Sequence, residues 1–322
     1  MKIVVLGTGG TIAGLAANPA DSSQYTAGQL GVAELLSDLP SIGQHQVLAE
    51  QVAQIDSKDM THEIWLLLAK RCAHWLAQDD VQALVITHGT DTLEETAFFL
   101  QTLLAPRKAV VLTCAMRPAN ALDADGPQNL RDALVVAAHP LACGVVAVCA
   151  GEVHSARDVQ KVHAWRLDAF SSGEAGPLAV VEEGIVRPLQ PFAEWPAQLV
   201  RASASLSAIA DLLHWPPFCA WPRVEIVWSH AAAHPGVVDA LLSQDVQGIV
   251  VAGTGNGRVH QALLPALRQA KAVGIRVVLA TRCANPQVRL PAGASLEFAD
   301  AGGLPPVKAR IALLLQLWAA DV

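Results

Sequence analysis

The sequence contains no apolar run near the roughly 18 to 20 residues that a helix needs to span a membrane. It also lacks a dense cluster of basic residues, and 22 lysines and arginines against 29 acidic residues give a net charge of -7. Such a balance argues against binding to the phosphate backbone of nucleic acid. With 52% hydrophobic residues available for a core, we expect a soluble globular protein with neither a membrane nor a nucleic-acid partner.

Cysteine is scarce, and no two cysteines form a CxxC pair. Most of the six stand in apolar surroundings, which predicts reduced core residues. The nearest approach to a zinc-binding helix, His62-Glu63, lacks the second histidine, so we expect neither a metal nor another cofactor. The six are Cys72, Cys114, Cys143, Cys149, Cys219 and Cys283.

No room for a secretory signal precedes the first predicted strand. A signal peptide needs a basic segment, an apolar segment and a small-residue cleavage site, and the chain enters an apolar strand at once. We therefore expect a cytoplasmic protein.

A glycine-rich turn follows that first strand, residues 3–6. Gly7, Gly9 and Gly10 permit positive φ angles and present Thr11 at the carboxyl end of the strand, where open α/β sheets bind ligands. Two nucleotide-binding signatures fail here. The dinucleotide fingerprint requires glycine or alanine where Ile12 stands, and a phosphate-binding loop requires lysine and serine or threonine after Gly14.

Apolar strand-like runs alternate with helix-like stretches along the chain, which indicates a doubly wound, mostly parallel sheet. A length of 322 residues suggests about two domains. We expect a larger N-terminal α/β domain over 1–190, a proline- and tryptophan-rich linker over 191–222, and a smaller C-terminal α/β domain over 223–322. The predicted strands are 3–6, 83–86, 109–114, 144–149, 224–228, 248–252 and 276–280, and the predicted helices are 32–37, 61–78, 93–104, 127–138, 237–242, 261–272 and 306–319.

A second threonine follows the strand at 83–86, in the run His88-Gly89-Thr90-Asp91-Thr92. Because carboxyl ends of parallel strands share one sheet edge, Thr90 and Thr11 should face one crevice. An alternative stays open on this segment alone, because Thr92 with Glu95, or Asp91 with Glu94, also fits a helix-capping box.

Two further residues are candidates for proton transfer. Lys161 follows the strand at 144–149, and beside Thr90 and Asp91 its amine would accept a proton from a hydroxyl. Tyr25, the only tyrosine, lies in a polar loop with no evident core role. It is either a surface residue or a lid residue that contacts Thr11 and excludes water when the loop closes.

Eight short motifs, in order across most of the chain, together resemble the bacterial-type L-asparaginase (asparaginase/glutaminase) family. The two long threonine-containing motifs and the tyrosine loop make the resemblance specific. The motifs are Thr8-Gly9-Gly10-Thr11-Ile12-Ala13-Gly14, residues 22–28 with Tyr25, residues 56–60 with Ser57, residues 88–96 with Thr90, residues 115–118, Asp125-Gly126-Pro127 with Asn129, residues 157–161 with Lys161, and Gly255-Asn256-Gly257.

The resemblance implies an amidohydrolase without a thiol or metal, which releases ammonia from L-asparagine. It implies two α/β domains in a homo-oligomer, a tetramer or at minimum a dimer. It further implies that Thr11 is the nucleophile assisted by Tyr25, and that Thr90, Asp91 and Lys161 form a second triad. Ser57 and Asp91 would hold the α-carboxylate and α-ammonium, with Asn256 as a further polar contact. From these roles we expect acyl transfer, with an oxyanion stabilised near Gly10 and Gly89 or by Thr90.

Two places depart from the family pattern. Lys58 stands where many members carry glutamine, and a cation there would repel an α-ammonium unless it points away. Within 285–298 we find no counterpart of the carboxylate that many relatives supply from a neighbouring subunit. Leu290 falls roughly at that place, and Glu297 is a loosely aligned alternative.

Three alternatives accompany this hypothesis. A glutaminase-asparaginase, or an amidase for another ω-amide, would use the same residues. A regulatory amino-acid-binding protein with an inactive site is opposed by the complete set of polar residues. A tRNA-dependent amidotransferase subunit is less expected, because no extra domain precedes the first strand and the charge is negative.

Overall fold

The computed structural model describes residues 1–37, 43–190, 221–288 and 297–320. The chain divides into two compact units, Met1–Ser203 and Ala204–Val322. Nearly all of the linker predicted at 191–222 lies outside the described residues, so its boundaries stay a prediction.

An eight-stranded sheet forms the centre of the first unit, in the order β12-β11-β8-β7-β6-β5-β1-β4. Five neighbouring strands are parallel, and three antiparallel strands extend the sheet beyond β7. The parallel strands are β1 (Lys2–Gly9), β4 (Gln46–Ile55), β5 (Val81–Thr87), β6 (Ala109–Thr113) and β7 (Gly144–Cys149), and the antiparallel ones are β8 (Glu152–Ser155), β11 (Ala179–Glu182) and β12 (Ile185–Pro188).

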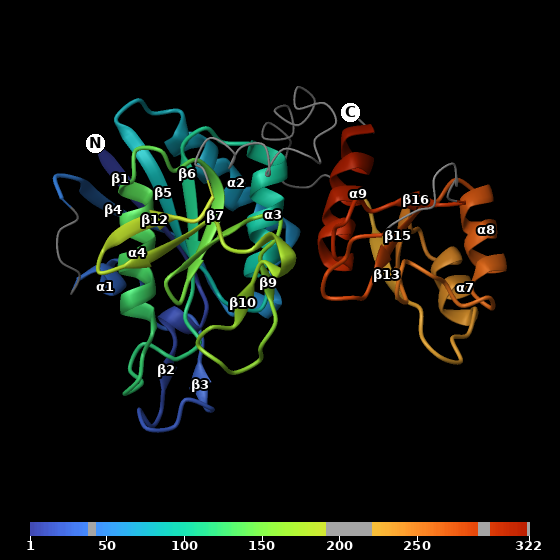
Figure 1. Ribbon diagram of the computed structural model, residues 1–322, viewed down its shortest axis with the longest axis horizontal. Coiled ribbons are helices and arrows are strands. Elements are labelled where there is room, and N and C mark those ends of the chain that lie inside the picture. Colours follow the sequence, from blue (N-terminus) through green and yellow to red (C-terminus); the bar gives the residue numbers. More distant parts are fainter. Residues whose placement is uncertain (38–42, 191–220, 289–296, 321–322) are drawn as a thin grey trace. The chain divides into compact units, whose positions relative to one another are not determined.

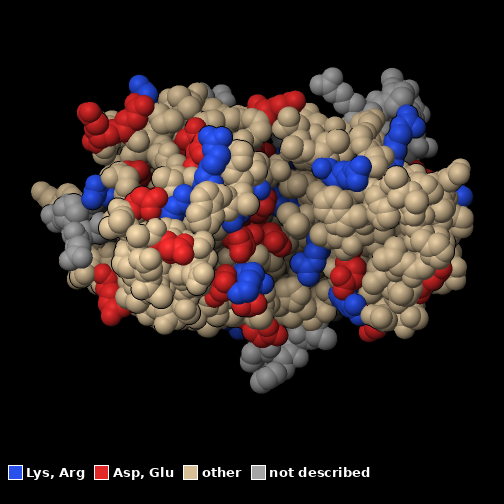
Figure 2. Space-filling view, turned by 90° about the horizontal axis from the view of Figure 1, so that it is seen from below, with Lys and Arg blue, Asp and Glu red and all other residues tan. Residues whose placement is uncertain are grey.

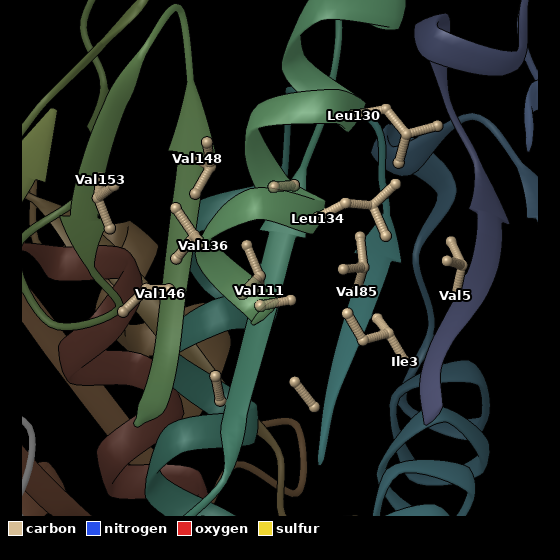
Figure 3. Packing of buried hydrophobic residues seen from close by; sticks show 14 of the residues in the cluster. Ile3, Val5, Val85, Val111, Leu130, Leu134, Val136, Val146, Val148 and Val153 are labelled. Carbon is tan, nitrogen blue, oxygen red and sulfur yellow. The ribbon is translucent and has the colours of Figure 1, made fainter. Parts of the chain in front are cut away.

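Helices cover both faces of this sheet (Figure 1). On one face lie α1 (Val32–Leu36) and α4 (Gly126–Ala138), and on the other lie α2 (His62–Leu76) and α3 (Leu93–Leu104). In Figure 3, Leu130 and Leu134 of α4 pack onto Val5, Val85 and Val111 of the strands. Because each fully buried aliphatic side chain contributes about 1.5–3 kcal/mol, this layer holds the parallel strands in place.

The order of the parallel strands produces a topological switch point beside β1. The chain passes from β1 to β4 on one side of β1 and then to β5 on the other side. The segments that leave the carboxyl ends of β1 and β5 therefore diverge, and open α/β sheets bind ligands at such a switch point.

The second unit is a smaller parallel sheet of the same kind. Its strands follow in order as β13 (Val224–Trp228), β14 (Gly248–Gly253), β15 (Arg276–Thr281) and β16 (Ala299–Asp300). Side chains of α7 (Gly236–Leu242) and α8 (Leu264–Ala272) form one apolar cluster with the sheet. The terminal helix α9 (Pro306–Ala320) packs against β13, β14 and β15.

The predicted fold class is confirmed, and α3 and β7 have the predicted bounds. The prediction missed β4, whose side chains are mostly exposed or half-buried, and α8 begins at Leu264 rather than at residue 261. A two-residue strand pair, β2 (Leu15–Ala16) with β3 (Tyr25–Thr26), was also missed in the polar loop that contains Tyr25. Within the described ranges, no helix combines the length and the apolar character needed to cross a bilayer.

The cysteine prediction holds only in part. Cys72, Cys114 and Cys149 are buried, Cys143 is partly buried, and Cys283 is exposed, which corrects the expectation for that residue. Cys283 lies just beyond the end of β15, where the chain leaves the core. Cys219 lies outside the described residues.

Candidate active site

The loops that follow β1 and β5 touch through their backbones. Gly10 has a φ of 82°, and its N–H donates to the carbonyl oxygen of Ile55 at 2.8 Å. A Cβ atom at Gly10 would lie 2.4 Å from the Cα of Gly89, a distance that no side chain tolerates. Only glycine at position 10 therefore permits the contact, which brings Thr11 and Thr90 to one sheet edge.

Thr11 meets Tyr25 beside this contact. Thr11 opens the 3-10 helix η1 (Thr11–Ala13), and its Oγ1 lies 2.8 Å from the hydroxyl oxygen of Tyr25. Tyr25 reaches it from the β2–β3 pair, and a Cβ at Gly14 would come within 2.9 Å of the tyrosine ring. Thr11 is buried while Tyr25 is 39% exposed, so the tyrosine is the solvent-accessible member of this pair.

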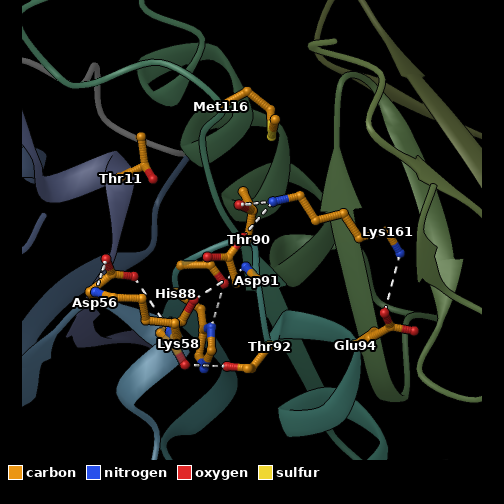
Figure 4. A network of polar contacts seen from close by, with 12 residues as sticks. Thr11, Asp56, Lys58, His88, Thr90, Asp91, Thr92, Glu94, Met116 and Lys161 are labelled. Carbon is orange, nitrogen blue, oxygen red and sulfur yellow. Dashed lines mark hydrogen bonds and ion pairs between the residues drawn. The ribbon is translucent and has the colours of Figure 1, made fainter. Parts of the chain in front are cut away.

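A second cluster joins Thr90, Asp91 and Lys161 (Figure 4). The Lys161 Nζ donates to Thr90 Oγ1 at 2.7 Å and to Asp91 Oδ1 at 2.6 Å. Lys161 belongs to β9 (Gln160–Lys161), which pairs with β10 (Phe170–Ser171), and its backbone N–H donates to the carboxylate of Glu94 at 3.4 Å. The lysine therefore folds back onto the threonine as the sequence hypothesis required.

Ser57 lies behind the second threonine loop. It starts the 3-10 helix η2 (Ser57–Asp59), and its Oγ accepts the backbone N–H of Asp91 at 3.2 Å. Its carbonyl oxygen accepts the Thr92 hydroxyl at 2.8 Å. These bonds place Ser57 and Asp91 side by side, as binding of one small zwitterion would require.

The capping alternative for this segment is confirmed for the position of Thr92 but not for its side-chain hydrogen bond. Thr92 is the N-cap residue of α3, but its side chain makes no capping hydrogen bond, and Asp91 precedes the cap. The physical reason is that the Thr92 hydroxyl is committed to the Ser57 carbonyl instead.

Lys58 is bound by its neighbours. Its Nζ lies 2.6 Å from Asp56 Oδ2 and 3.2 Å from Asp59 Oδ2. Hydrogen bonds to Asp56 and then Asp59 raise the pKa of Lys58. Figure 4 shows the lysine side chain extending toward Asp56. The positive charge of Lys58 is therefore paired with two carboxylates.

His88 supports the second loop from within the core, a role that sequence reasoning missed. Its Nδ1 lies 2.7 Å from the carbonyl oxygen of Gly89, and its Nε2 lies 2.9 Å from Thr96 Oγ1, which also accepts the indole N–H of Trp65 at 2.8 Å. Burial lowers the pKa of His88 to about 4. The ring is therefore neutral, and because a carbonyl oxygen only accepts, Nδ1 carries the proton. The planar peptide then directs the N–H of Thr90 away from the ring.

Asp125 fixes the loop beyond β6. Its carboxylate accepts the backbone N–H groups of Met116 and Arg117, each at 2.9 Å, and the side-chain amide of Asn129 at 3.2 Å. Asn129 also bonds the Cys114 carbonyl oxygen at 2.9 Å, which ties the loop to the end of the strand.

Two buried thiols lie close together near these strand ends. The Sγ atoms of Cys114 and Cys149 lie 3.2 Å apart. The hydrogen bond with Cys149, together with burial, raises the pKa of the Cys114 thiol. A high pKa suits a core thiol rather than a nucleophile. Over the described ranges, no group of three or more histidine, cysteine or acidic residues could hold a metal ion.

The remaining candidates lie in the second unit. Asn256 follows β14, and its contact with substrate stays a prediction. The carboxylate of Glu297 accepts the guanidinium of Arg268 at 2.5 Å, so it is already paired within its own unit. Leu290 lies outside the described residues.

Charges of both signs are found on the surface of the described residues. Figure 2 looks at the molecule from the side on which β2 and β3 lie in Figure 1. On this face, acidic and basic side chains of the described residues are intermingled rather than gathered by sign.

Comparisons with known proteins agree over the whole chain. The model of the family described as Asparaginase, N-terminal, matches residues 2–192, and that of the Glutaminase/Asparaginase C-terminal domain matches residues 223–321. The chain is 35% identical to L-asparaginase 2 of Bacillus subtilis, over 98% of this chain and 82% of that protein. It is 36% identical to L-asparaginase 2 of Escherichia coli, over 98% and 88%.

Two further similarities extend the comparison. The chain is 36% identical to a glutaminase-asparaginase of Pseudomonas fluorescens, over 86% of this chain and 74% of that protein. Among solved structures, a probable cytoplasmic L-asparaginase from Campylobacter jejuni superimposes with a TM-score of 0.87 at 35% identity, covering 98% of this chain and 95% of that one.

The buried histidine predicts a pH dependence of stability. The unfolded chain takes up a proton at His88 below about pH 6.5, whereas the folded chain does so only near pH 4. The free energy of unfolding therefore falls as the pH drops through this window, by up to about 3 kcal/mol from this residue.

Urea denaturation from pH 7 to pH 5 checks this expectation. His88→Gln should flatten the decline, whereas His163→Gln, at an exposed histidine of the same unit, should leave it unchanged. If the free energy of unfolding declined equally with pH in the wild type and both variants, His88 would not be the source of the decline.

Proposed function

Because this chain belongs to the asparaginase family, we propose that it hydrolyses L-asparagine to L-aspartate and ammonia with Thr11 as the nucleophile. One observation carries this proposal: the Thr11–Tyr25 pair and the Thr90–Lys161–Asp91 cluster lie on loops that touch at Gly10 and Gly89. Two hydroxyl groups, each with a partner for its proton, are therefore carried by loops that are in contact.

The first half of the reaction forms an ester. Thr11 Oγ1 attacks the carbonyl carbon of the side-chain amide, and Tyr25, 2.8 Å away, assists transfer of the hydroxyl proton toward the departing nitrogen. Backbone N–H groups beside Gly10 and Gly89, or the Thr90 side chain, stabilise the oxyanion. The carbon–nitrogen bond breaks, ammonia leaves, and Thr11 carries a β-aspartyl ester.

The second half returns the threonine. A water molecule attacks the ester, and the Thr90–Lys161–Asp91 cluster orients it and relays its proton to Thr11 Oγ1. Lys161 is suited to the relay because its Nζ contacts both Thr90 and Asp91. Aspartate and the free hydroxyl are the products.

Ser57 and Asp91 are proposed to hold the α-carboxylate and α-ammonium of the substrate. Their backbone and side-chain contact places a hydroxyl donor beside a carboxylate acceptor. The same groups suit glutamine, whose amide is one methylene further away. The similarity to a glutaminase-asparaginase keeps that second substrate as a candidate, and steady-state kinetics on both amino acids decide between them.

We also propose a cytoplasmic homo-oligomer, a tetramer or a dimer as its minimal unit, on the strength of the family resemblance.

Replacing Thr11 tests the nucleophile. Thr11→Val keeps the shape of the side chain but removes the hydroxyl, so ammonia release from asparagine should fall by roughly a thousandfold or more. Thr102→Val, on the distant part of α3, is the matched control and should retain full activity. Substantial turnover by a folded Thr11→Val protein would exclude Thr11 as the nucleophile.

Asp56→Asn tests how the protein tolerates a lysine near the proposed ammonium site. Removing this carboxylate leaves Asp59 as the remaining partner of Lys58 and raises the charge of this group from −1 to zero, so weaker attraction of the α-ammonium should raise the KM for asparagine by roughly three- to tenfold. Succinamate has the same carboxamide and carboxylate but no α-ammonium, and its KM should not rise.

Two further variants serve as a rescue and a control for Asp56→Asn. Lys58→Gln added to Asp56→Asn should restore the KM for asparagine. Asp79→Asn, at an exposed carboxylate, should leave the KM for asparagine and for succinamate unchanged. A parallel rise for asparagine and succinamate would place the α-ammonium elsewhere.

A further inference from the structure

Residues 117–124, here called the brace, lie against residues 15–28, here called the tyrosine loop. The brace connects β6 to α4. Its backbone donates two hydrogen bonds to the tyrosine-loop side, from Ala119 to the Gly14 carbonyl oxygen at 2.8 Å and from Leu122 to that of Pro19 at 3.2 Å.

Asn120 makes the most specific contact between the two segments. Its Oδ1 accepts the backbone N–H of Ala16 at 2.8 Å, and its Nδ2 donates to the Ala16 carbonyl oxygen at 2.8 Å. One side-chain amide thus satisfies both backbone groups of one residue, as a neighbouring strand would.

Ala16 is the residue paired with Tyr25 in the β2–β3 ladder. Tyr25 in turn reaches Thr11 at 2.8 Å. A continuous series of contacts therefore runs from Asn120 through Ala16 and Tyr25 to the proposed nucleophile.

The brace is the fixed partner in this contact. Asp125 accepts the backbone N–H of Arg117, and the Arg117 side chain bonds Asp123 at 3.2 Å and the Trp165 carbonyl oxygen at 3.0 Å. The guanidinium also lies 4.6 Å from the centre of the Trp165 ring. By contrast, nearly every residue between 17 and 26 is exposed, so the tyrosine loop is the side with little packing of its own.

We propose that Asn120 is a positioning residue that holds Tyr25 against Thr11, an inference that rests on the proposed roles of those two residues. Two neutral hydrogen bonds are lost when the amide is removed, which lowers the ratio of closed to open loop by roughly tenfold. The loss reaches the chemistry only through Tyr25.

The single tyrosine of this chain makes the position of the loop directly observable. In protein grown with 3-fluorotyrosine, one fluorine resonance reports on Tyr25 alone. Asn120→Ala should shift or broaden this resonance. Asn120→Asp should do the same, because the variant keeps the shape and one acceptor but turns an oxygen toward the Ala16 carbonyl.

The matched control is Asn18→Ala, which removes an amide of the tyrosine loop that bonds only locally, to the N–H of Ala20 at 3.1 Å. Its resonance should match that of the wild type. An unchanged resonance in both folded Asn120 variants would overturn the proposal. This readout does not depend on turnover, so it stands apart from any failure of the proposed function.

Kinetics then test whether Asn120 acts through the tyrosine. Asn120→Ala should lower kcat/KM for asparagine by roughly tenfold, but by less than about twofold when Tyr25 is already phenylalanine. Equal losses in both backgrounds would show that Asn120 acts independently of Tyr25. A shifted resonance with an unchanged kcat/KM would show that the position of Tyr25 does not affect catalysis. It would therefore overturn the positioning role of Asn120.

Discussion

The backbone contact between Gly10 and Gly89 is the constraint on which the site depends. β1 and β5 are adjacent and in register, so the segments beyond them emerge together before they diverge. A Cβ atom at position 10 would force the loops apart, because it would meet the backbone of Gly89 at 2.4 Å. The glycines of the two motifs therefore allow the loops that carry Thr11 and Thr90 to touch.

The parts of the site differ in how firmly they are held. Thr90 and Ser57 stand on a buried framework in which the neutral ring of His88 bonds the Gly89 carbonyl oxygen. Lys161 comes from a short strand pair outside the main sheet. Tyr25 comes from an exposed loop that is secured by the brace. In the proposed mechanism, the firmly held groups bind and polarise the substrate, and the group assigned to close over Thr11 comes from the loop with the least packing of its own.

Much of this arrangement could be predicted from the sequence where the determinants are local. The apolar run before Gly7 and the glycines after it predict a strand and a turn, and the alternation of strands and helices predicts the parallel sheet that brings Thr11 and Thr90 to one edge. β4 was missed because its exposed positions interrupt any apolar run. Asn120 gave no signal, since its partner Ala16 lies 104 positions away and is recognised through backbone atoms that carry no sequence signature. His88 was overlooked for a related reason, because its Nε2 partner, Thr96, becomes a neighbour only once α3 has packed. The orientation of Lys58 likewise depends on carboxylates at positions 56 and 59, whose effect on the lysine is a matter of side-chain geometry.

The central claim is that two touching loops serve a single covalent step at Thr11. Its most direct test is to quench the protein with acid during turnover of asparagine and to locate any acyl adduct by mass spectrometry of its peptides. The expected result is a β-aspartyl ester on the peptide that contains Thr11, which disappears on incubation without substrate. An adduct on Thr90 instead, or turnover at full rate with no adduct under conditions that trap esters, would contradict the claim.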